Sequence, residues 1–279
     1  MLVNIKNLSF SYLGSNKKTL KNIDIEINGG ERILLAGING AGKSTLLRIL
    51  SGQHAAYDIE YFNVAGYRTP QSGVGGVSFV GDTWKRSINF VGTTNYMVDM
   101  LVRDFMKKVQ DQNIKRRNEL VDILKIDLNW NIKELSDGQR RRVQIMLGLV
   151  QPFKLLLLDE ITSELDIIVR RNFLNYLKKE TIENNSTVIY ATHILDELSS
   201  WTTKIFYIDN NRNLKKYMWE NTMSKISLKN IIVDNMLNDY NIMEKEKSTE
   251  EAANKKTENI LFGPQGGYSS GRSQNILKQ

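Results

Sequence analysis

The sequence predicts an α/β fold whose core is a mostly parallel sheet, with an antiparallel β subdomain and an inserted α-helical subdomain. Short apolar runs typical of buried strands occur at residues 33–36, 155–158, 187–190 and 205–208. Helical segments separate the last three runs, and strands that alternate with helices indicate a parallel sheet covered on both faces. Alternating apolar residues at 3–10 and 20–27 predict paired antiparallel strands. Between about residues 93 and 150 the apolar spacing becomes helical, which predicts the inserted subdomain.

Composition excludes several classes of function. The 279 residues include no cysteine and two histidines, which excludes disulfides, thiolate catalysis, zinc–sulfur sites and histidine-rich metal sites. The net charge of +7 permits a nucleic-acid partner but does not indicate one. No run approaches the roughly 18 apolar residues that span a bilayer, and the N-terminus lacks the layout of a secretion signal. We therefore expect no integral membrane segment and a cytoplasmic location, with the nucleus left open as a second compartment.

The segment after the apolar run 33–36 carries the first chemical motif. Residues 37–45 read GINGAGKST and match G-x-x-x-x-G-K-[ST], the phosphate-binding loop. Its glycines let backbone N–H groups close around phosphate oxygens. Lys43 supplies a positive charge to the β and γ phosphates, and the Ser44 hydroxyl can bind Mg²⁺. The residues expected to hold the nucleotide are Gly37, Asn39, Gly40, Ala41, Gly42, Lys43, Ser44 and Thr45.

Two adjacent acids, Asp159 and Glu160, end the apolar run 155–158. Adjacent carboxylates at the C-terminal end of a buried strand need a positive or proton-bearing partner. In a protein with a phosphate-binding loop, Asp159 is expected to hold Mg²⁺ directly or through water. Glu160 is expected to polarise the attacking water as a general base.

Three further motifs decide between the families that share this loop. Residues 135–139 read LSDGQ at the start of a predicted helix, 163–166 read SELD, and 191–193 read ATH at a strand end. These match the signature, the D-loop and the switch-histidine loop of the ATP-binding cassette (ABC) proteins. Across residues 1 to about 210 the chain therefore resembles an ABC ATPase domain, with every motif in the family's order.

The resemblance implies an ATPase that binds ATP together with Mg²⁺. It implies that Tyr12 stacks on adenine, and that His193 stabilises the charge that develops on the transferred phosphoryl group. In this family two cassettes pair head to tail, and the signature of one closes over the γ-phosphate held by the other. The resemblance therefore implies a homodimer or a pair with another cassette. Residues assigned to this closure are Ser136, Gly138, Gln139 and Asp166.

Two positions depart from the common family pattern. Gly81-Asp82 stands where most members have a glutamine after a strand, and Ile161 stands where most have proline. Asp82 is the candidate for the glutamine position and could still bind Mg²⁺ through water. With these departures the chain resembles the subfamily-I ABC proteins related to the yeast CCR-NOT-associated ABC factor, a group found also in plants and protists.

Three uses of such an ATP switch stay open at this point. The favoured one is an ATPase without its own membrane domain that regulates a partner complex, by resemblance the CCR-NOT machinery of transcription and mRNA decay. The second is the ATPase subunit of a transporter whose membrane domains are separate chains. The third is a nucleotide-binding scaffold with negligible turnover, which the presence of Asp159, Glu160 and His193 disfavours.

We expect the cassette to span residues 1–242, with the helical subdomain at about 83–135. Residues 243–279 are expected to be a charged linker and a short C-terminal tail, because this stretch begins with many charges and almost no apolar residue and should not fold alone. Within it, residues 266–272 resemble a closing segment of the same group. The arginines at 140–142 are expected to make packing or ion-pair contacts and not a nucleic-acid patch.

Overall fold

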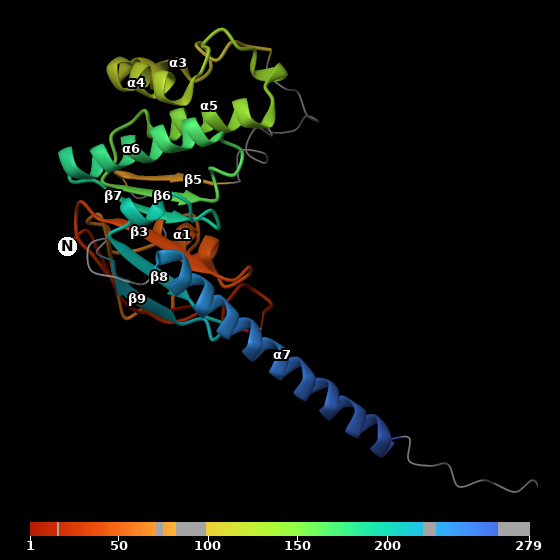
Figure 1. Cartoon of the computed structure of the whole chain (residues 1–279). Coiled ribbons are helices and arrows are strands. Elements are labelled where there is room, and N and C mark those ends of the chain that lie inside the picture. The colour runs from red at the N-terminus through yellow and green to blue at the C-terminus, as the bar shows by residue number, and fades with distance from the viewer. Residues whose placement is uncertain (16, 71–74, 82–98, 220–226, 262–279) are drawn as a thin grey trace, which may run out of the picture. The chain divides into compact units, whose positions relative to one another are not determined.

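The computed structural model describes residues 1–279 except 16, 71–74, 82–98, 220–226 and 262–279, and it confirms the predicted fold class. The strands of the core sheet are β3 (Arg32–Gly37), β5 (Val77–Val80), β6 (Leu155–Asp159), β7 (Thr187–Ala191), β8 (Lys204–Ile208) and β9 (Leu214–Met218). They form a six-stranded sheet in the order β5-β6-β7-β3-β8-β9 (Figure 1). Neighbouring strands are parallel except for β8 and β9, which are antiparallel.

Helices pack directly on this sheet. They are α1 (Lys43–Leu50), α5 (Asp137–Leu149) and α6 (Ile167–Glu183). Helix α1 contacts β3 and β6, α5 contacts β5, and α6 contacts β7. Every residue of β6 and β7 is buried, which explains why these strands read as continuous apolar runs. The loops that follow β3, β6 and β7 therefore begin from rigid, buried strands.

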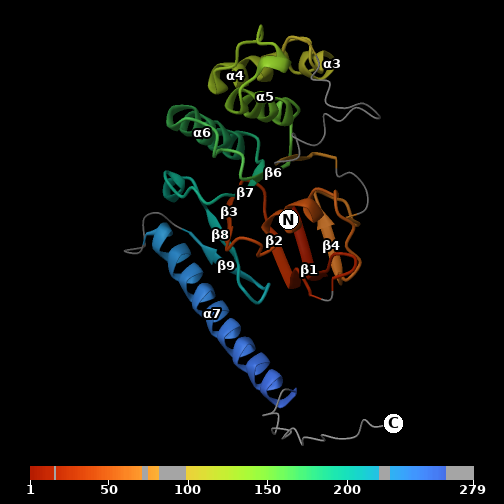
Figure 2. The ribbon, with the colours of Figure 1, turned by 90° about the vertical axis from the view of Figure 1, so that its right-hand side faces the viewer.

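A separate antiparallel sheet forms the predicted β subdomain (Figure 2). It contains β1 (Val3–Phe10), β2 (Leu20–Ile27) and β4 (Tyr61–Val64) in the order β2-β1-β4. Val3 pairs with Ile27 and Phe10 with Leu20, so the two alternating runs at the N-terminus do form a hairpin. The end of β1 leads to Tyr12, and this places the tyrosine near the start of α1.

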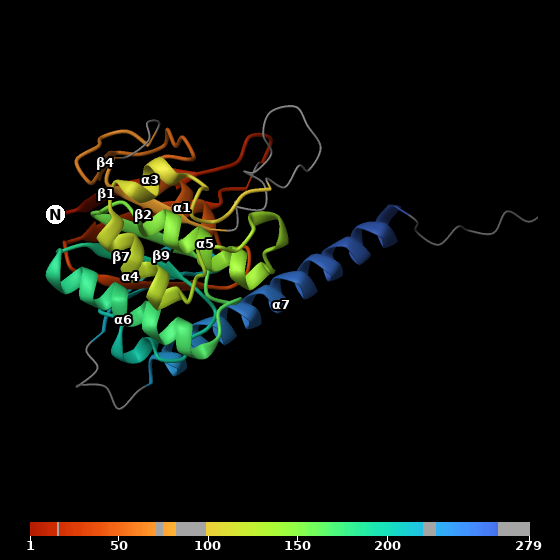
Figure 3. The same ribbon diagram turned by 90° about the horizontal axis from the view of Figure 1, so that it is seen from above.

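The inserted helices are α3 (Lys107–Asp111) and α4 (Ile114–Leu124). Of these, α4 contacts both α5 and α6, and α3 contacts α4, as can be followed in the view from above (Figure 3). Leu120 and Leu124 of α4 are fully buried and join one continuous core with residues of α5 and α6. The helical character predicted for this part of the chain is present. The expected start of the subdomain near residue 83 lies outside the described residues, and its boundaries stay a prediction.

A buried ion pair fastens the inserted subdomain to the core. Arg116 of α4 donates from Nη1 and Nη2 to the two carboxylate oxygens of Glu180 in α6, both at 2.9 Å. Its Nε donates to the Leu149 carbonyl at 2.6 Å, and its guanidinium lies over the Phe153 and Tyr176 rings. One side chain thus connects α4, α5 and α6.

We expect Arg116→Ala to lower the free energy of unfolding by about 2 kcal/mol, because it leaves the buried Glu180 carboxylate without its charged donor. Chemical denaturation measures this loss. The control is Lys179→Ala, since Lys179 and Glu119 form an exposed pair at 3.0 Å between the same two helices. That variant should keep the wild-type denaturation midpoint. Equal losses in the two variants would contradict the assignment of Arg116 as the fastening residue.

The first part of the charged segment after residue 242 is helical, and its expected role as a linker stays a prediction. Helix α7 runs without a break over Leu228–Leu261. No glycine or proline interrupts these residues, and lysine, glutamate and alanine are strong helix formers. The chain divides into two compact units, Met1–Leu237 and Asn238–Gln279, so the expected cassette boundary at 242 stays a prediction. In the first unit, Leu228 and Ile232 of α7 are buried in the core.

Among the described residues, no helix combines the length and apolar character needed to cross a bilayer.

Candidate functional site

The loop between β3 and α1 has a backbone that only glycine adopts easily. Gly37, Gly40 and Gly42 have φ values of +151°, +75° and +108°. A Cβ on Gly37 would lie 2.6 Å from the Ile208 carbonyl oxygen, and one on Gly42 would lie 2.9 Å from the Thr19 carbonyl oxygen. Gly42 precedes α1 without a side-chain cap, so N–H groups of the first helical turn are left for another acceptor. The loop therefore fits a bound phosphate chain.

Lys43 is buried and folds back onto this loop. Its Nζ donates to the carbonyls of Gly37 and Ile38 at 2.8 and 3.2 Å, and it lies 3.5 Å from Nε2 of His193. Burial lowers the pKa of Lys43, while the carboxylates of Glu160 and Asp159 act in the opposite direction. The ammonium donates to neutral carbonyls, and the charges of the two acids favour its protonated form, which suits an anionic ligand.

Asp159 ends β6 close to the start of α1. Its side chain is 9% exposed, and burial raises its pKa, whereas a hydrogen bond with Ser44 acts to lower it. A hydroxyl and a carboxylate are hard oxygen ligands of the kind that Mg²⁺ prefers. Ser44 and Asp159 therefore lie together as the sequence predicts for a magnesium site.

We expect Asp159→Asn to stabilise the nucleotide-free protein at pH 7, with a melting temperature about 2 to 4 °C higher. The raised pKa means that the folded protein holds the Asp159 proton more tightly than the unfolded chain does. The wild type therefore loses stability as the pH rises through the interval between the two pKa values. Asparagine does not ionise and so avoids this loss of stability. The higher melting temperature of Asp159→Asn should therefore disappear at pH values below that interval. Thermal melts from pH 3 to 7 measure it, and a pH-independent difference would contradict the explanation.

Glu160 and His193 meet beside Lys43. Oε1 of Glu160 lies 2.9 Å from Nε2 of His193, and both side chains are partly exposed. The Glu160 N–H donates to the Ala191 carbonyl at 2.9 Å, and Glu160 has a left-handed backbone with a φ of +52°. The two adjacent acids therefore have different surroundings. Asp159 is buried beside Ser44, whereas Glu160 is partly exposed to solvent and contacts His193.

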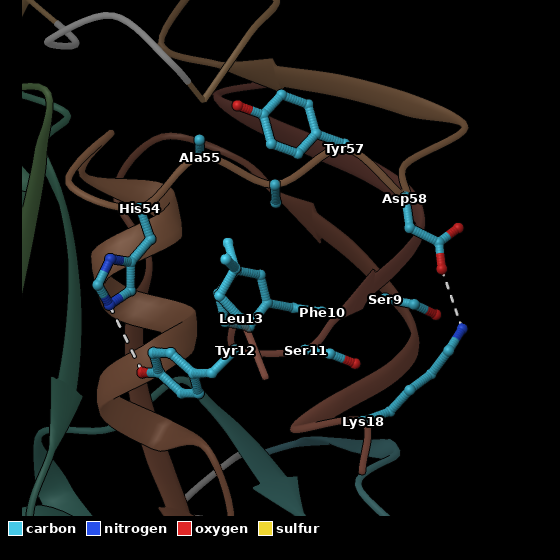
Figure 4. Close-up of a pocket in the computed structure, with 11 residues that line it drawn as sticks. Ser9, Phe10, Ser11, Tyr12, Leu13, Lys18, His54, Ala55, Tyr57 and Asp58 are labelled. Carbon is cyan, nitrogen blue, oxygen red and sulfur yellow. Dashed lines mark hydrogen bonds and ion pairs between the residues drawn. The ribbon is translucent and has the colours of Figure 1, made fainter. Parts of the chain in front are cut away.

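Tyr12 lies beside the end of the phosphate-binding loop at which α1 begins. Its hydroxyl is 2.9 Å from Oγ1 of Thr45, and its side chain is 42% exposed. The ring lines a pocket formed by the end of β1 and the segment after α1 (Figure 4). An exposed aromatic face next to the phosphate loop can stack on a nucleobase.

The LSDGQ segment starts α5 with a complete capping box. Ser136 Oγ accepts from the Gln139 N–H at 3.3 Å, and Gln139 Oε1 accepts from the Ser136 N–H at 3.0 Å. Ser136 is exposed, and Gly138 is half-buried. Across the described part of the chain, no hydrogen bond or ion pair joins Ser136, Gly138 or Gln139 to residues 37–45. The structure thus assembles the loop, the two acids and the histidine, and leaves the LSDGQ segment apart from them.

Two of the three arginines connect α5 to the SELD segment. Arg142 Nη2 lies 2.9 Å from Oδ2 of Asp166, whose other oxygen caps α6 by accepting from the Val169 N–H. Arg141 Nε lies 3.4 Å from Oε2 of Glu164. These pairs confirm the expectation of ion-pair contacts for this basic run.

Arg141 also reaches a third segment that sequence reasoning missed. Its Nη1 donates to the Gly81 carbonyl at 3.3 Å and to Gln144 Oε1 at 2.7 Å, and Gln144 Nε2 donates to the same carbonyl at 2.6 Å. This buried guanidinium ties the end of β5 to α5. Asp82, the expected substitute for the family glutamine, follows Gly81 directly and lies outside the described residues.

Comparison with known proteins supports the same interpretation. The family model described as "ABC transporter" matches residues 20–163. The chain is 39% identical to "ABC transporter I family member 20" of Arabidopsis thaliana, over 75% of this chain and 67% of that protein. It is 34% identical to "CCR4-associated factor 16" of Saccharomyces cerevisiae, over 75% and 76% of the two chains.

Solved structures of similar fold include ATP-binding cassettes. A dimeric cassette in a post-hydrolysis state, bound to ADP and phosphate, matches with a TM-score of 0.63 and 20% identity, over 78% of this chain and 99% of that one. The ATP-binding subunit of an ABC transporter matches with a TM-score of 0.68 and 18% identity, over 84% and 99%. At these identities the likeness concerns the fold alone.

Proposed function

The chain belongs to the ATP-binding cassette family, and from that premise we propose that it binds ATP with Mg²⁺, hydrolyses it, and acts as an ATP-driven dimerisation switch. One observation carries this proposal. Lys43, Glu160 and His193 lie in contact next to a loop shaped for phosphate, and Asp159 lies beside Ser44. A scaffold that only binds nucleotide has no need of the partly exposed Glu160–His193 pair.

The proposed roles follow from the chemistry of each group. The phosphate loop and Lys43 hold the β and γ phosphates, and Ser44 and Asp159 hold the metal. Bound Mg²⁺ neutralises charge on the phosphate oxygens. Glu160 accepts the proton of the attacking water, because its carboxylate is open to the site. His193 donates a hydrogen bond to the phosphoryl oxygens as charge develops there.

The proposed dimer follows from the position of the LSDGQ segment. The start of α5 offers helix N–H groups and the Ser136 hydroxyl, and this suits it to a phosphate that the same chain does not place there. In a head-to-tail pair, a second cassette would supply this phosphate, and its own LSDGQ segment would meet the phosphate bound by the first cassette. Gln139 and Asp166 then act mainly by shaping this surface, through the cap of α5 and the pair with Arg142.

The biological use proposed for the switch is the regulation of a partner complex in the cytoplasm. Its support is the name of the yeast relative, a CCR4-associated factor, and it points to a CCR-NOT-type complex. The second candidate, a transporter ATPase subunit, is supported by names such as the "Spermidine/putrescine import ATP-binding protein PotA" of Borrelia garinii, which is 31% identical over 73% of this chain.

Steady-state ATP turnover, measured with the wild type and with Lys43→Met, tests the enzymatic proposal. Absence of Lys43-dependent phosphate release would contradict it. Affinity purification with identification of the chains that co-purify tests the biological role. Deadenylase or transcription components would support regulation of a partner complex, and integral membrane proteins would support transport instead.

A further inference from the structure

A cluster of three rings beside the phosphate loop includes a histidine that the nucleotide motifs do not use. Phe10 and His54 are stacked, with ring centroids 5.9 Å apart and an interplanar angle of 11°. Tyr12 meets both rings edge-on, with its centroid 5.1 Å from that of Phe10 and 5.6 Å from that of His54. The three rings line a pocket of about 530 Å³ (Figure 4). Because Phe10 ends β1, Tyr12 follows it and His54 follows α1, the cluster joins the antiparallel subdomain to the helix of the phosphate loop.

The Tyr12 hydroxyl connects two partners on opposite sides. It lies 2.9 Å from Oγ1 of Thr45 and 3.5 Å from Nε2 of His54, the second contact being drawn in Figure 4. A phenol hydroxyl has one proton to donate and lone pairs that accept. Either oxygen of the Tyr12–Thr45 pair can donate, and in the arrangement that we assign Thr45 donates to Tyr12 and Tyr12 donates to His54. It requires an unprotonated Nε2 on His54.

The surroundings of His54 favour that state. Burial lowers the pKa of His54, and the nearby Arg48 of α1 lowers it further. The other charged groups of the pocket, Lys18 and Asp58, form a pair with each other at 2.9 Å. These surroundings favour the neutral imidazole, which the assigned arrangement needs.

We propose that His54 is a positioning residue, which holds the Tyr12 ring ready for the base of the bound nucleotide. This inference rests on the proposed ATP binding at the phosphate loop and adds a residue outside its motifs. A ring that is already held loses less conformational freedom when a ligand stacks on it, so the affinity rises. The gain in affinity comes from the contact with the base, so a ligand that has phosphates but no base should not show it.

The test compares binding of ATP with binding of inorganic tripolyphosphate, each with Mg²⁺, by titration calorimetry on the full chain. We expect His54→Ala to weaken ATP binding about three- to tenfold and to leave tripolyphosphate binding unchanged. Tyr12→Phe keeps the ring but removes the hydroxyl's contacts with both His54 and Thr45, so it should weaken ATP binding at least as much as His54→Ala does. The double variant should bind ATP no more weakly than Tyr12→Phe alone, because Tyr12→Phe already removes the contact with His54. His54→Gln retains an acceptor and should bind ATP within about twofold of the wild type.

The matched control is Tyr61→Phe, which removes a tyrosine hydroxyl from β4 of the same sheet, outside the pocket. It should bind both ligands as the wild type does. The inference would be overturned if the losses of ATP affinity from His54→Ala and Tyr12→Phe multiplied in the double variant. It would also be overturned if His54→Ala weakened tripolyphosphate binding as much as ATP binding. A wild type that binds ATP and tripolyphosphate, combined with an unaffected His54→Ala, would overturn the role of His54 alone. A wild type that binds neither ligand would overturn the proposed function as well.

Discussion

Glu160→Gln is expected to lower ATP turnover about 10³-fold, while ATP binding is retained. Glutamine has the shape of glutamate and can still make a hydrogen bond to His193, but it cannot accept a proton from water at neutral pH. The carboxylate that it replaces is half-exposed and lies 2.9 Å from His193 at the mouth of the phosphate loop. Because hydrolysis is blocked after binding, the dimer should accumulate in the presence of ATP. Phosphate release and size-exclusion chromatography with ATP measure the two effects.

The control for this variant is Glu197→Gln. Glu197 is also an exposed glutamate with a left-handed backbone, at φ +66°, and lies outside the candidate site. It should turn over ATP at the wild-type rate and form no persistent dimer. Wild-type turnover in Glu160→Gln would show that another group takes the proton. Low turnover without dimer accumulation would separate the role of Glu160 in catalysis from the proposed switch.

The parts of the site that depend on local sequence were predictable. The loop at 37–45 and the acids at 159–160 are set by glycine geometry and by a buried strand that must end at its polar residues, so their positions follow from neighbours in the chain. The fold class followed in the same way, from the alternation of strands with helices.

The parts that depend on distant contacts were not predictable. Arg141 meets the Gly81 carbonyl across 60 positions of sequence, and Tyr12 meets His54 across 42. The residues next to Arg141 and Tyr12 in the sequence do not indicate which distant residue the fold brings into contact with each of them. The charge pattern gave a partial signal, since two acids in the SELD segment could be matched with the basic run after the signature. The helical state of α7 did not follow from composition, because composition reports whether a segment can bury a core of its own and not whether its backbone is helical.

The head-to-tail arrangement predicts that two inactive variants restore activity when mixed. Lys43→Met removes the buried ammonium of the phosphate loop, and Ser136→Asp places a negative charge where the partner's γ-phosphate would bind. Aspartate is a good N-cap, so α5 should keep its start. Each variant alone should lose about 10³-fold in turnover, since each removes or reverses charge stabilisation at both sites of its own dimer.

A mixed dimer, with one chain of each variant, contains one intact ATP site and one site that carries both substitutions. The intact loop of the Ser136→Asp chain meets the intact signature of the Lys43→Met chain, and the two lesions fall together in the second site. Random pairing of equal amounts makes half of the dimers mixed, so turnover should return to about a quarter of the wild-type rate. Ser136→Asn is the neutral control, because it caps α5 without adding charge. It lacks the hydroxyl proposed to meet the phosphate, so its turnover should fall, but far less than that of Ser136→Asp. Were the signature to act on the phosphate loop of its own chain, every chain in the mixture would carry a lesion in its own site. The mixture would then be no more active than its components.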